Sequence, residues 1–543
     1  MKPPPRDKWD RETALVAQIA ACASFVSFVF YSQHNYLLLY GDAVAHINIA
    51  RRVFDSLTPG LLQLGTVWLP LPHLLMLPFL LSDSLWQSGI GGSLPSLAAY
   101  VLATAGMFRL GRQTLSLYAE PNFAARAAAW SAAVIYGANP NLLYLQTTAM
   151  TEPLYLAFFV WSVVYFSEFA HAAESDAESA RASLLRCGGC LLGACLTRYD
   201  GWFLAAALCL AALVTGWKHG ELRRSVAKFV VVAVLAPALW LAYNAVIYRN
   251  PLEFANGPYS ARAIEQKSIA EGVAPHPGSH NFTVAASYFL KSAEFNVAEG
   301  KWQVIWVALL LLGPTIILFT NRRLWPLLLL AVPLPFYVLS VARGNTPIYV
   351  PGWWPFSYYN TRYGIELLPA MAVCAGLAMH LLLRFAQNRA TKTAVTLGVL
   401  ILVAGSYASV RRAQPICFRE AWTNSSARIA LETEVATNIR KLPHDARLLM
   451  YLGDHVGALQ QAGFPLRQVI NEGNHRPWKE PADPDGLWEH ALADPARFVD
   501  LVVAFDGDPV AQHVEKRDLT SMIVVRTVGQ PAVTIYATRR WQR

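Results

Sequence analysis

The sequence predicts an α-helical polytopic membrane protein that ends in a small α/β domain. Of its 543 residues, 54% are apolar and only 15% are charged, and the mean hydropathy is positive, at +0.31. A soluble protein is typically about 25% charged. Beyond about residue 413 the charged residues become frequent and short apolar runs alternate with helical ones, which predicts the α/β part.

Eleven segments are long and apolar enough to approach the about 20 residues that a membrane-spanning helix needs. They are 13–33, 94–110, 127–142, 153–170, 183–198, 201–216, 227–247, 302–320, 324–342, 365–384 and 393–409. Basic residues cluster at alternate ends, which places the N-terminus in the cytoplasm and the C-terminus outside. A chain with its two ends on opposite sides crosses the membrane an odd number of times, and the eleven segments already supply that number. Segment 67–82, with its three prolines, must therefore lie along the outer surface or re-enter the membrane.

The chain is thereby divided into a membrane part, 1–410, and an extracytoplasmic α/β domain, 411–543. The first apolar run is too long for a cleaved signal peptide and is retained as a span. We attribute the net charge of +9 to basic residues at cytoplasmic span ends and to a site for an anionic substrate, and we expect no nucleic-acid partner.

The first outer loop, 34–93, has the strongest signature of a site. Asp42 and His46 are four residues apart and share one face of a helix. Arg51 follows, and His73 lies among the prolines of the ambiguous segment. Charge, proline and aromatic residues in so long a connection are more than a simple link between spans requires.

Three further outer positions are candidates. Glu152 stands where a helix re-enters the membrane, either as a helix-capping acid or as a second site carboxylate facing Asp42. Arg198 either pairs with nearby Asp200 or binds substrate. Arg362 lies at the mouth of a span, where a buried guanidinium needs an anion, and its fork geometry suits a phosphate.

Several motifs, in this order, resemble those of the C-type glycosyltransferases, and more closely the bacterial relatives of the dolichyl-phosphate-mannose protein mannosyltransferases and of the aminoarabinose transferases. The motifs are an acid running into IARR, a proline-rich stretch, an acid at the fourth span, LTRYDGW and NTRYGIELLPAMA. The resemblance covers about 13–410. It departs at Asp42-Ala43, where the mannosyltransferases have adjacent acids, and at Gly65-Thr66-Val67, where the aminoarabinose transferases have an acid.

The resemblance implies a sugar transfer at the outer face of a bacterial inner membrane, from a polyprenyl-phosphate donor to a hydroxyl of a lipid, glycan or protein acceptor. Asp42 would be the general base of an inverting attack, assisted by Glu152, and Arg362 would hold the phosphate. The expected substrate-binding residues are His46, Arg51, His73, Arg198, Tyr359 and Arg362.

Two alternatives stay open at this point. His46 orients Asp42, joins a metal site or is a neutral packing histidine; we expect no cofactor, with a divalent cation held by Asp42 and Glu152 as the alternative. A transporter or flippase of a lipid-linked sugar is the rival function, but it would place polar residues at the membrane midplane, typically with internal repeats. Here the polar groups gather in outer loops.

Overall fold

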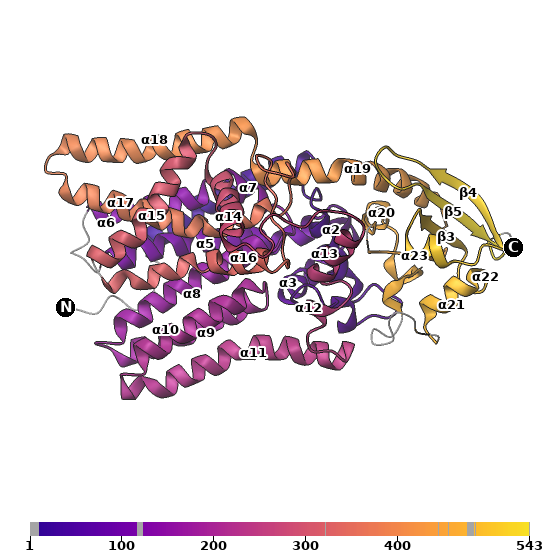
Figure 1. The fold of residues 1–543 in the computed structure, drawn as a ribbon, viewed down its shortest axis with the longest axis horizontal. Coiled ribbons are helices and arrows are strands. Elements are labelled where there is room, and N and C mark those ends of the chain that lie inside the picture. Colours follow the sequence, from indigo (N-terminus) through magenta and orange to yellow (C-terminus); the bar gives the residue numbers. More distant parts are fainter. Residues whose placement is uncertain are drawn as a thin grey trace.

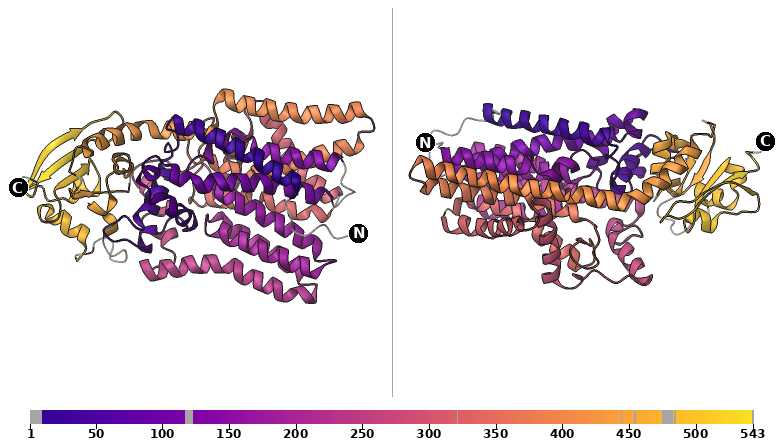
Figure 2. Two further views of the ribbon diagram at one scale, coloured as in Figure 1. Left: turned by 180° about the vertical axis from the view of Figure 1, so that it is seen from behind. Right: turned by 90° about the horizontal axis from the view of Figure 1, so that it is seen from above.

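The computed structural model describes residues 10–116, 123–320, 322–443, 445–453, 455–474, 483 and 485–541. The molecule is elongated, with a bundle of long helices at one end and a small sheet at the other (Figure 1). Short helices and irregular segments of the first outer loop lie between the two (Figures 1 and 2).

Each of the eleven predicted spans is mostly helical. The helices that carry them are α1 (Arg11–Gln33), α5 (Ile90–Ser116), α6 (Phe123–Gly137), α8 (Glu152–Ala172), α9 (Ala177–Cys195), α10 (Asp200–Gly216), α11 (Arg223–Tyr248), α15 (Trp302–Thr320), η3 with α16 (Arg322–Ala331 and Pro333–Ala342), α17 (Leu368–Phe385) and α18 (Arg389–Ala413). Among the described residues, eight helical stretches are long and apolar enough to cross a membrane. The chain is therefore an integral membrane protein, while the count of eleven and the orientation stay predictions.

The ambiguous segment 67–82 contains α3 (Leu71–Leu80), a helix of ten residues. At 1.5 Å per residue it is about 15 Å long, half the thickness of the hydrocarbon core. A single helix of this length does not span the hydrocarbon core, and the path of the whole segment relative to the membrane stays a prediction. The other elements that precede α19 and lie between the predicted spans, or overlap only their ends, are α2 (Gly41–Arg52), η1 (Leu61–Leu64), α4 (Asp83–Gln87), α7 (Pro140–Leu145), η2 (Gly220–Leu222), α12 (Glu253–Asn256), α13 (Ala261–Ala270), α14 (Phe282–Val297) and η4 (Thr361–Leu367).

Small residues bring α6 against its neighbours. A Cβ atom added at Gly111 of α5 would lie 3.0 Å from the Cα of Ala129, and one at Gly376 of α17 would lie 3.0 Å from the carbonyl oxygen of Ala128. In a membrane the hydrophobic effect does not drive helices together, and small residues that let two backbones approach closely allow the helices to associate through van der Waals packing. Ala125 and Ala128 of this alanine-rich helix belong to the main apolar core of the bundle.

The C-terminal part contains a five-stranded sheet in the order β2-β1-β3-β5-β4. β1 pairs in parallel with β2 and β3, and β5 pairs antiparallel with β3 and β4, so the predicted α/β character holds for half of the sheet. The elements are β1 (Leu448–Met450), α20 (Gly457–Ala462), η5 (Leu466–Gln468), β2 (Val469–Ile470), η6 (Glu472–Asn474), α21 (Leu487–Ala493), α22 (Pro495–Phe498), β3 (Leu501–Phe505), α23 (Pro509–His513), β4 (Leu519–Val525) and β5 (Val533–Thr538).

A long helix that the sequence analysis did not anticipate joins the bundle to the sheet. This helix, α19 (Ile416–Ile439), follows α18 along the long axis of the molecule (Figure 2). Its buried residues include Ile416, Leu431 and Val435, which belong to an apolar core shared by bundle and sheet. The predicted division near residue 410 stays a prediction, and α19 lies at this junction.

Candidate active site

Asp42 lies in the first turn of α2, where the helix dipole favours an acid. Most of the following residues of α2, among them His46 and Asn48, are buried, whereas the side chain of Asp42 is 42% exposed. The helix thus presents one carboxylate at an accessible position while the rest of it is packed.

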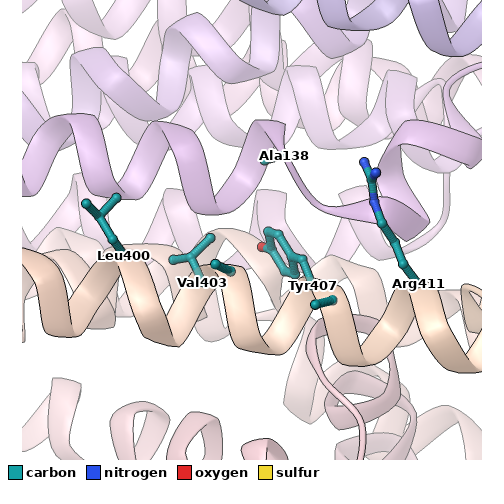
Figure 3. A pocket seen from close by; sticks show the side chains of 7 residues that line it. Ala138, Leu400, Val403, Tyr407 and Arg411 are labelled. Carbon is teal, nitrogen blue, oxygen red and sulfur yellow. The ribbon is translucent and has the colours of Figure 1, made fainter.

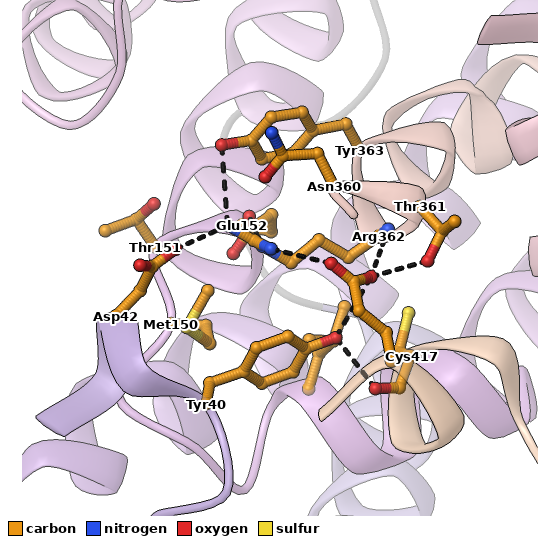
Figure 4. Close-up of polar contacts among 12 residues, drawn as sticks. Tyr40, Asp42, Met150, Thr151, Glu152, Asn360, Thr361, Arg362, Tyr363 and Cys417 are labelled. Carbon is orange, nitrogen blue, oxygen red and sulfur yellow. Dashed lines mark hydrogen bonds and ion pairs between the residues drawn. The ribbon is translucent and has the colours of Figure 1, made fainter. Parts of the chain in front are cut away.

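Arg362 contacts three carboxylates that come from three helices. Its Nη2 donates to Asp42 Oδ2 (2.5 Å), its Nε to Glu152 Oε1 (3.0 Å) and its Nη1 to Glu420 Oε1 (2.9 Å). Figure 4 shows Asp42, Glu152 and Arg362 pointing toward one another. The Arg362 cluster, as we name these four residues, unites three predicted site residues with Glu420.

Glu420, near the start of α19, was missed by the sequence analysis. It also accepts hydrogen bonds from the Arg362 backbone N–H (3.1 Å) and from Thr361 Oγ1 (2.5 Å), so it fixes both the backbone and the guanidinium at this point. No local pattern marks it, because it stands in an ordinary mixed segment and becomes a partner of Arg362 only through the fold.

A second arginine, Arg198, has a similar set of partners. Arg198 pairs with Glu152 Oε1 (3.2 Å), Asp200 Oδ2 (3.1 Å) and Glu366 Oε1 (3.3 Å), and its Nη2 donates to the Tyr337 hydroxyl (2.8 Å). The predicted Arg198–Asp200 pair is therefore present within a larger Arg198 cluster made of these five residues. Glu366 was missed, although an acid inside an apolar run is a signal of function.

Glu152 joins the two clusters. Its Oε1 accepts from both Arg198 and Arg362, and the residue is fully buried. It is the first residue of α8, but the helix is capped by no side chain. The geometry thus places Glu152 as a carboxylate across Arg362 from Asp42, and its other oxygen, Oε2, has no hydrogen-bond partner.

The two predicted histidines contact each other. His46 Nδ1 lies 2.9 Å from His73 Nε2, and the Trp68 ring packs at 4.7 Å from the His46 ring. Burial, and then the charge of Arg362, lowers the pKa of His46 from 6.5 to about 3. Burial also lowers the pKa of His73 well below its ordinary value. Both rings are neutral at pH 7, so the pair shares one N–H between them.

Arg51 lies apart from the two clusters. It pairs with Asp55 (2.8 Å) and Asp83 (2.6 Å), donates to the Leu80 carbonyl (2.6 Å), and covers the Trp86 ring at 4.7 Å. These contacts tie α2 to the following turns of the first outer loop. Arg51 therefore stabilises the first outer loop, and none of these partners belongs to either cluster.

Tyr359 stands beside the accessible side of the Arg362 cluster. It is half-exposed and pairs with Tyr349 through a short backbone bridge. Burial, and then the charge of Asp42, raises the pKa of Tyr359 above its ordinary value. Its hydroxyl is thus a neutral polar group near Asp42, the exposed carboxylate of the Arg362 cluster.

The alternative of a cation between Asp42 and Glu152 does not fit this arrangement. The Arg362 guanidinium already occupies the space between the two carboxylates, at 2.5 and 3.0 Å. Within the described part of the chain, no group of three or more His, Cys, Asp or Glu side chains is placed to hold a metal ion.

A separate cavity lies on the side of the bundle, away from both clusters. It is lined by Ala138, Leu400, Val403, Ala404, Tyr407, Ala408 and Arg411 (Figure 3). Apart from Arg411 at one end and the Tyr407 hydroxyl, which is bonded to the Ile135 carbonyl, the lining is apolar. No residue of the Arg362 cluster contributes to it.

Comparison with known proteins identifies the fold. No protein-family model and no curated protein matches the sequence. Among solved structures, ArnT from Cupriavidus metallidurans bound to undecaprenyl phosphate aligns over 96% of this chain and 97% of that chain, with 15% identity and a TM-score of 0.58. The chain has the fold of ArnT.

The same protein in its apo state gives 16% identity and a TM-score of 0.54, over 96% of this chain and 97% of that chain. An oligosaccharyltransferase from Archaeoglobus fulgidus gives 12% identity and a TM-score of 0.49, over 98% of this chain and 76% of that one. The likeness to ArnT, an aminoarabinose transferase, confirms the C-type glycosyltransferase fold that the motifs indicated.

Proposed function

We propose that the protein is a membrane glycosyltransferase that moves a sugar from a polyprenyl-phosphate donor to an acceptor hydroxyl, with inversion. One observation carries the proposal: of the five carboxylates around Arg362 and Arg198, Asp42 alone is exposed, at 42%, whereas the other four are at most 2% exposed. A reacting carboxylate has to reach substrate, and Asp42 alone among these five is placed to do so.

The fold supports the choice of donor. ArnT was solved with undecaprenyl phosphate, a polyprenyl phosphate, and its fold extends over nearly the whole of this chain. Such a donor combines an anionic headgroup with an apolar tail that stays in the bilayer. We place the reaction at the outer face of a bacterial inner membrane, where the first outer loop is predicted to lie.

Arg362 is the proposed phosphate ligand. Glu152 and Glu420 are buried and hold its Nε and Nη1, whereas the contact of Nη2 with Asp42 is the one that can open toward solvent. A donor phosphate that takes the place of Asp42 on Nη2 would keep the guanidinium paired and would release the Asp42 carboxylate. The fixed cation then stabilises the negative charge that develops on the leaving phosphate.

The released Asp42 is the proposed general base. It takes the proton of the acceptor hydroxyl as that oxygen forms a bond to the anomeric carbon of the sugar. The bond from this carbon to the phosphate oxygen breaks on the opposite face, and polyprenyl phosphate leaves with the bonding electrons. Because a phosphate is a stable leaving group, no general acid is needed, and we propose no metal or cofactor.

The other predicted residues receive supporting roles. Glu152 holds both arginines, and we assign the neutral pair of His46 and His73 to the support of α2 and Tyr359 to substrate binding. The Arg198 cluster fixes Glu152 from the buried side. We leave the sugar open, as well as the choice among lipid, glycan and protein acceptors.

A donor panel tests this function. Purified wild-type protein in detergent or vesicles is supplied with radiolabelled polyprenyl-phosphate sugars and candidate acceptors, beside Asp42→Asn and the control Asp83→Asn, a change at an exposed acid of the same loop. We expect transfer from one donor by the wild type and the control but not by Asp42→Asn. Binding without transfer of any donor, together with movement of label across the vesicle membrane, would favour the flippase alternative.

A further inference from the structure

The start of α2, the helix that carries Asp42, is held by the part of the chain from Ile416 onward, which we call the C-terminal segment. Arg428 of α19 donates from Nη2 to the carbonyl oxygens of Leu38 and Leu39, each at 3.0 Å. Tyr40, which immediately precedes α2, donates its hydroxyl to the Cys417 carbonyl at 2.7 Å. Because these residues set the entry of the chain into α2, α19 determines where the first turn of that helix lies.

The middle of α2 is held by a closed set of three buried side chains. Gln460 of α20 accepts from Asn48 Nδ2 (2.7 Å) and donates to the Trp86 carbonyl (2.8 Å), and Trp86 Nε1 donates to Asn48 Oδ1 (3.0 Å). Each of these residues is at most 2% exposed. Loss of the Gln460 side chain would remove two buried hydrogen bonds, and Asn48 Nδ2 and the Trp86 carbonyl would keep only their contacts with the Val44 carbonyl and the Gly89 N–H, which is costly.

The end of α2 leads into a third contact with the same segment. Asp55 accepts from the backbone N–H of Arg467 (3.1 Å) and from its Nη1 (3.3 Å), and Asn474 Nδ2 donates to Thr58 Oγ1 (3.0 Å). The C-terminal segment therefore contacts the chain before, within and after α2, although the paired residues are about 400 positions apart in sequence.

We infer that the C-terminal segment is a positioning device for Asp42, in which Gln460 and Arg428 are the positioning residues. This inference rests on the proposed role of Asp42 as the base. A catalytic group has to be held to within about 0.5 Å of its productive geometry, and a misplacement of about 1 Å can cost 10²-fold in rate. Asp42 stands on a short helix of a loop, so its precision has to come from such external contacts.

Hydrogen exchange of residues 41–52, combined with transfer kinetics, tests the inference. In Gln460→Ala we expect backbone exchange in this stretch to rise about tenfold. We expect kcat to fall by about 10- to 100-fold, while KM for the donor stays within about twofold. The matched control is Gln512→Ala, an exposed glutamine of α23 whose side chain donates to the Gly507 carbonyl of the same segment.

Arg428→Gln tests the other end of α2 and does not depend on whether Gln460→Ala folds. Its control is Arg440→Gln, because among the described residues Arg440 donates from its side chain to the Gln461 carbonyl, away from α2. Unchanged exchange at 41–52 in both test variants, or equal changes in the controls, would overturn the inference. Faster exchange in the test variants of a protein whose wild type transfers no sugar would confirm the positioning and refute the proposed function.

Discussion

The Arg362 cluster and the Arg198 cluster have nearly the same composition but different surroundings. Each contains one arginine with three carboxylates, and Glu152 belongs to both. In the Arg198 cluster every carboxylate is at most 2% exposed, whereas in the Arg362 cluster Asp42 is half-exposed. The same ionic chemistry thus gives a set of buried carboxylates in one cluster and one solvent-accessible carboxylate, the proposed reacting group, in the other.

The physical reason lies in desolvation. A buried carboxylate is stable only while its cation remains, and removal of one partner of a buried pair costs about 3–5 kcal/mol. An exposed carboxylate keeps much of its hydration and contributes at most about 1 kcal/mol through an ion pair. Changes in the two clusters should therefore separate activity from stability.

The largest expected effect comes from matched Asp→Asn changes in the two clusters. Asp42→Asn should lower kcat by about 10²–10⁴-fold, with little change in unfolding free energy, because the amide oxygen can still accept from Arg362. Asp200→Asn should instead destabilise the protein, because it weakens a buried pair with Arg198. Transfer assays and thermal unfolding of both variants check this; near-normal turnover of Asp42→Asn would refute its role as base.

Glu152→Gln removes the charge that both clusters share. Since its Oε1 accepts from both arginines in a fully buried position, we expect a loss of about 3–5 kcal/mol in unfolding free energy and a loss of transfer. Chemical denaturation in detergent measures the first and the donor assay the second. A stability equal to that of the wild type would mean that the clusters are not coupled through Glu152.

Replacing each arginine by lysine tests whether the two clusters have different roles in donor binding and in stability. Arg362→Lys should raise KM for the donor about tenfold, because an ammonium cannot offer the two-pronged contact that a guanidinium offers to phosphate. Arg198→Lys should lower the melting temperature and leave the donor KM within about twofold. Saturation kinetics with the donor measure the difference; a larger KM change in Arg198→Lys would exchange the roles assigned to the clusters.

The buried, neutral pair of His46 and His73 predicts that the stability of the protein depends on pH. The pKa of His46 is about 3 in the fold and 6.5 when unfolded, so below pH 6.5 the unfolded chain binds the extra proton. Stability is complete above about pH 7 and falls as the pH drops below 6.5, by about 1.4 kcal/mol at pH 5.5 for this one group. Melting temperatures from pH 7.5 to 5.0 should show this slope in the wild type and a smaller slope in His46→Gln.

The smallest effect is expected at an ion pair next to the Arg362 cluster in sequence but outside it. Arg419, the neighbour of Glu420, pairs with Glu299, and both side chains are about one-fifth exposed. Glu299→Gln should change unfolding free energy by at most about 1 kcal/mol and transfer by less than about twofold. A loss as large as that of Glu152→Gln would show that any ion pair in this region, and not the two clusters specifically, supports activity.

The class of the protein could be predicted from the sequence alone, and so could several of the residues that the fold brings together. The predicted spans correspond to helices because hydropathy and span length are local properties of the chain. Glu152 and Arg362 could be singled out because an acid or an arginine at the mouth of an apolar helix is costly and therefore conspicuous. Asp42 could be singled out because it is four residues from His46 in a long, charged loop. The Arg198–Asp200 pair, two residues apart, was likewise within reach of local reasoning.

Which charged side chains form ion pairs, and which of them are buried, could be read only from the folded structure. Arg362 is 320 residues from Asp42, 210 from Glu152 and 58 from Glu420, so no local pattern could pair them. The support role of Arg51, the contact of His46 with His73 and the hold of Gln460 on α2 have the same origin. Hydropathy acts along the chain, whereas desolvation and ion pairing depend on distances in space, which exist only once the chain has folded.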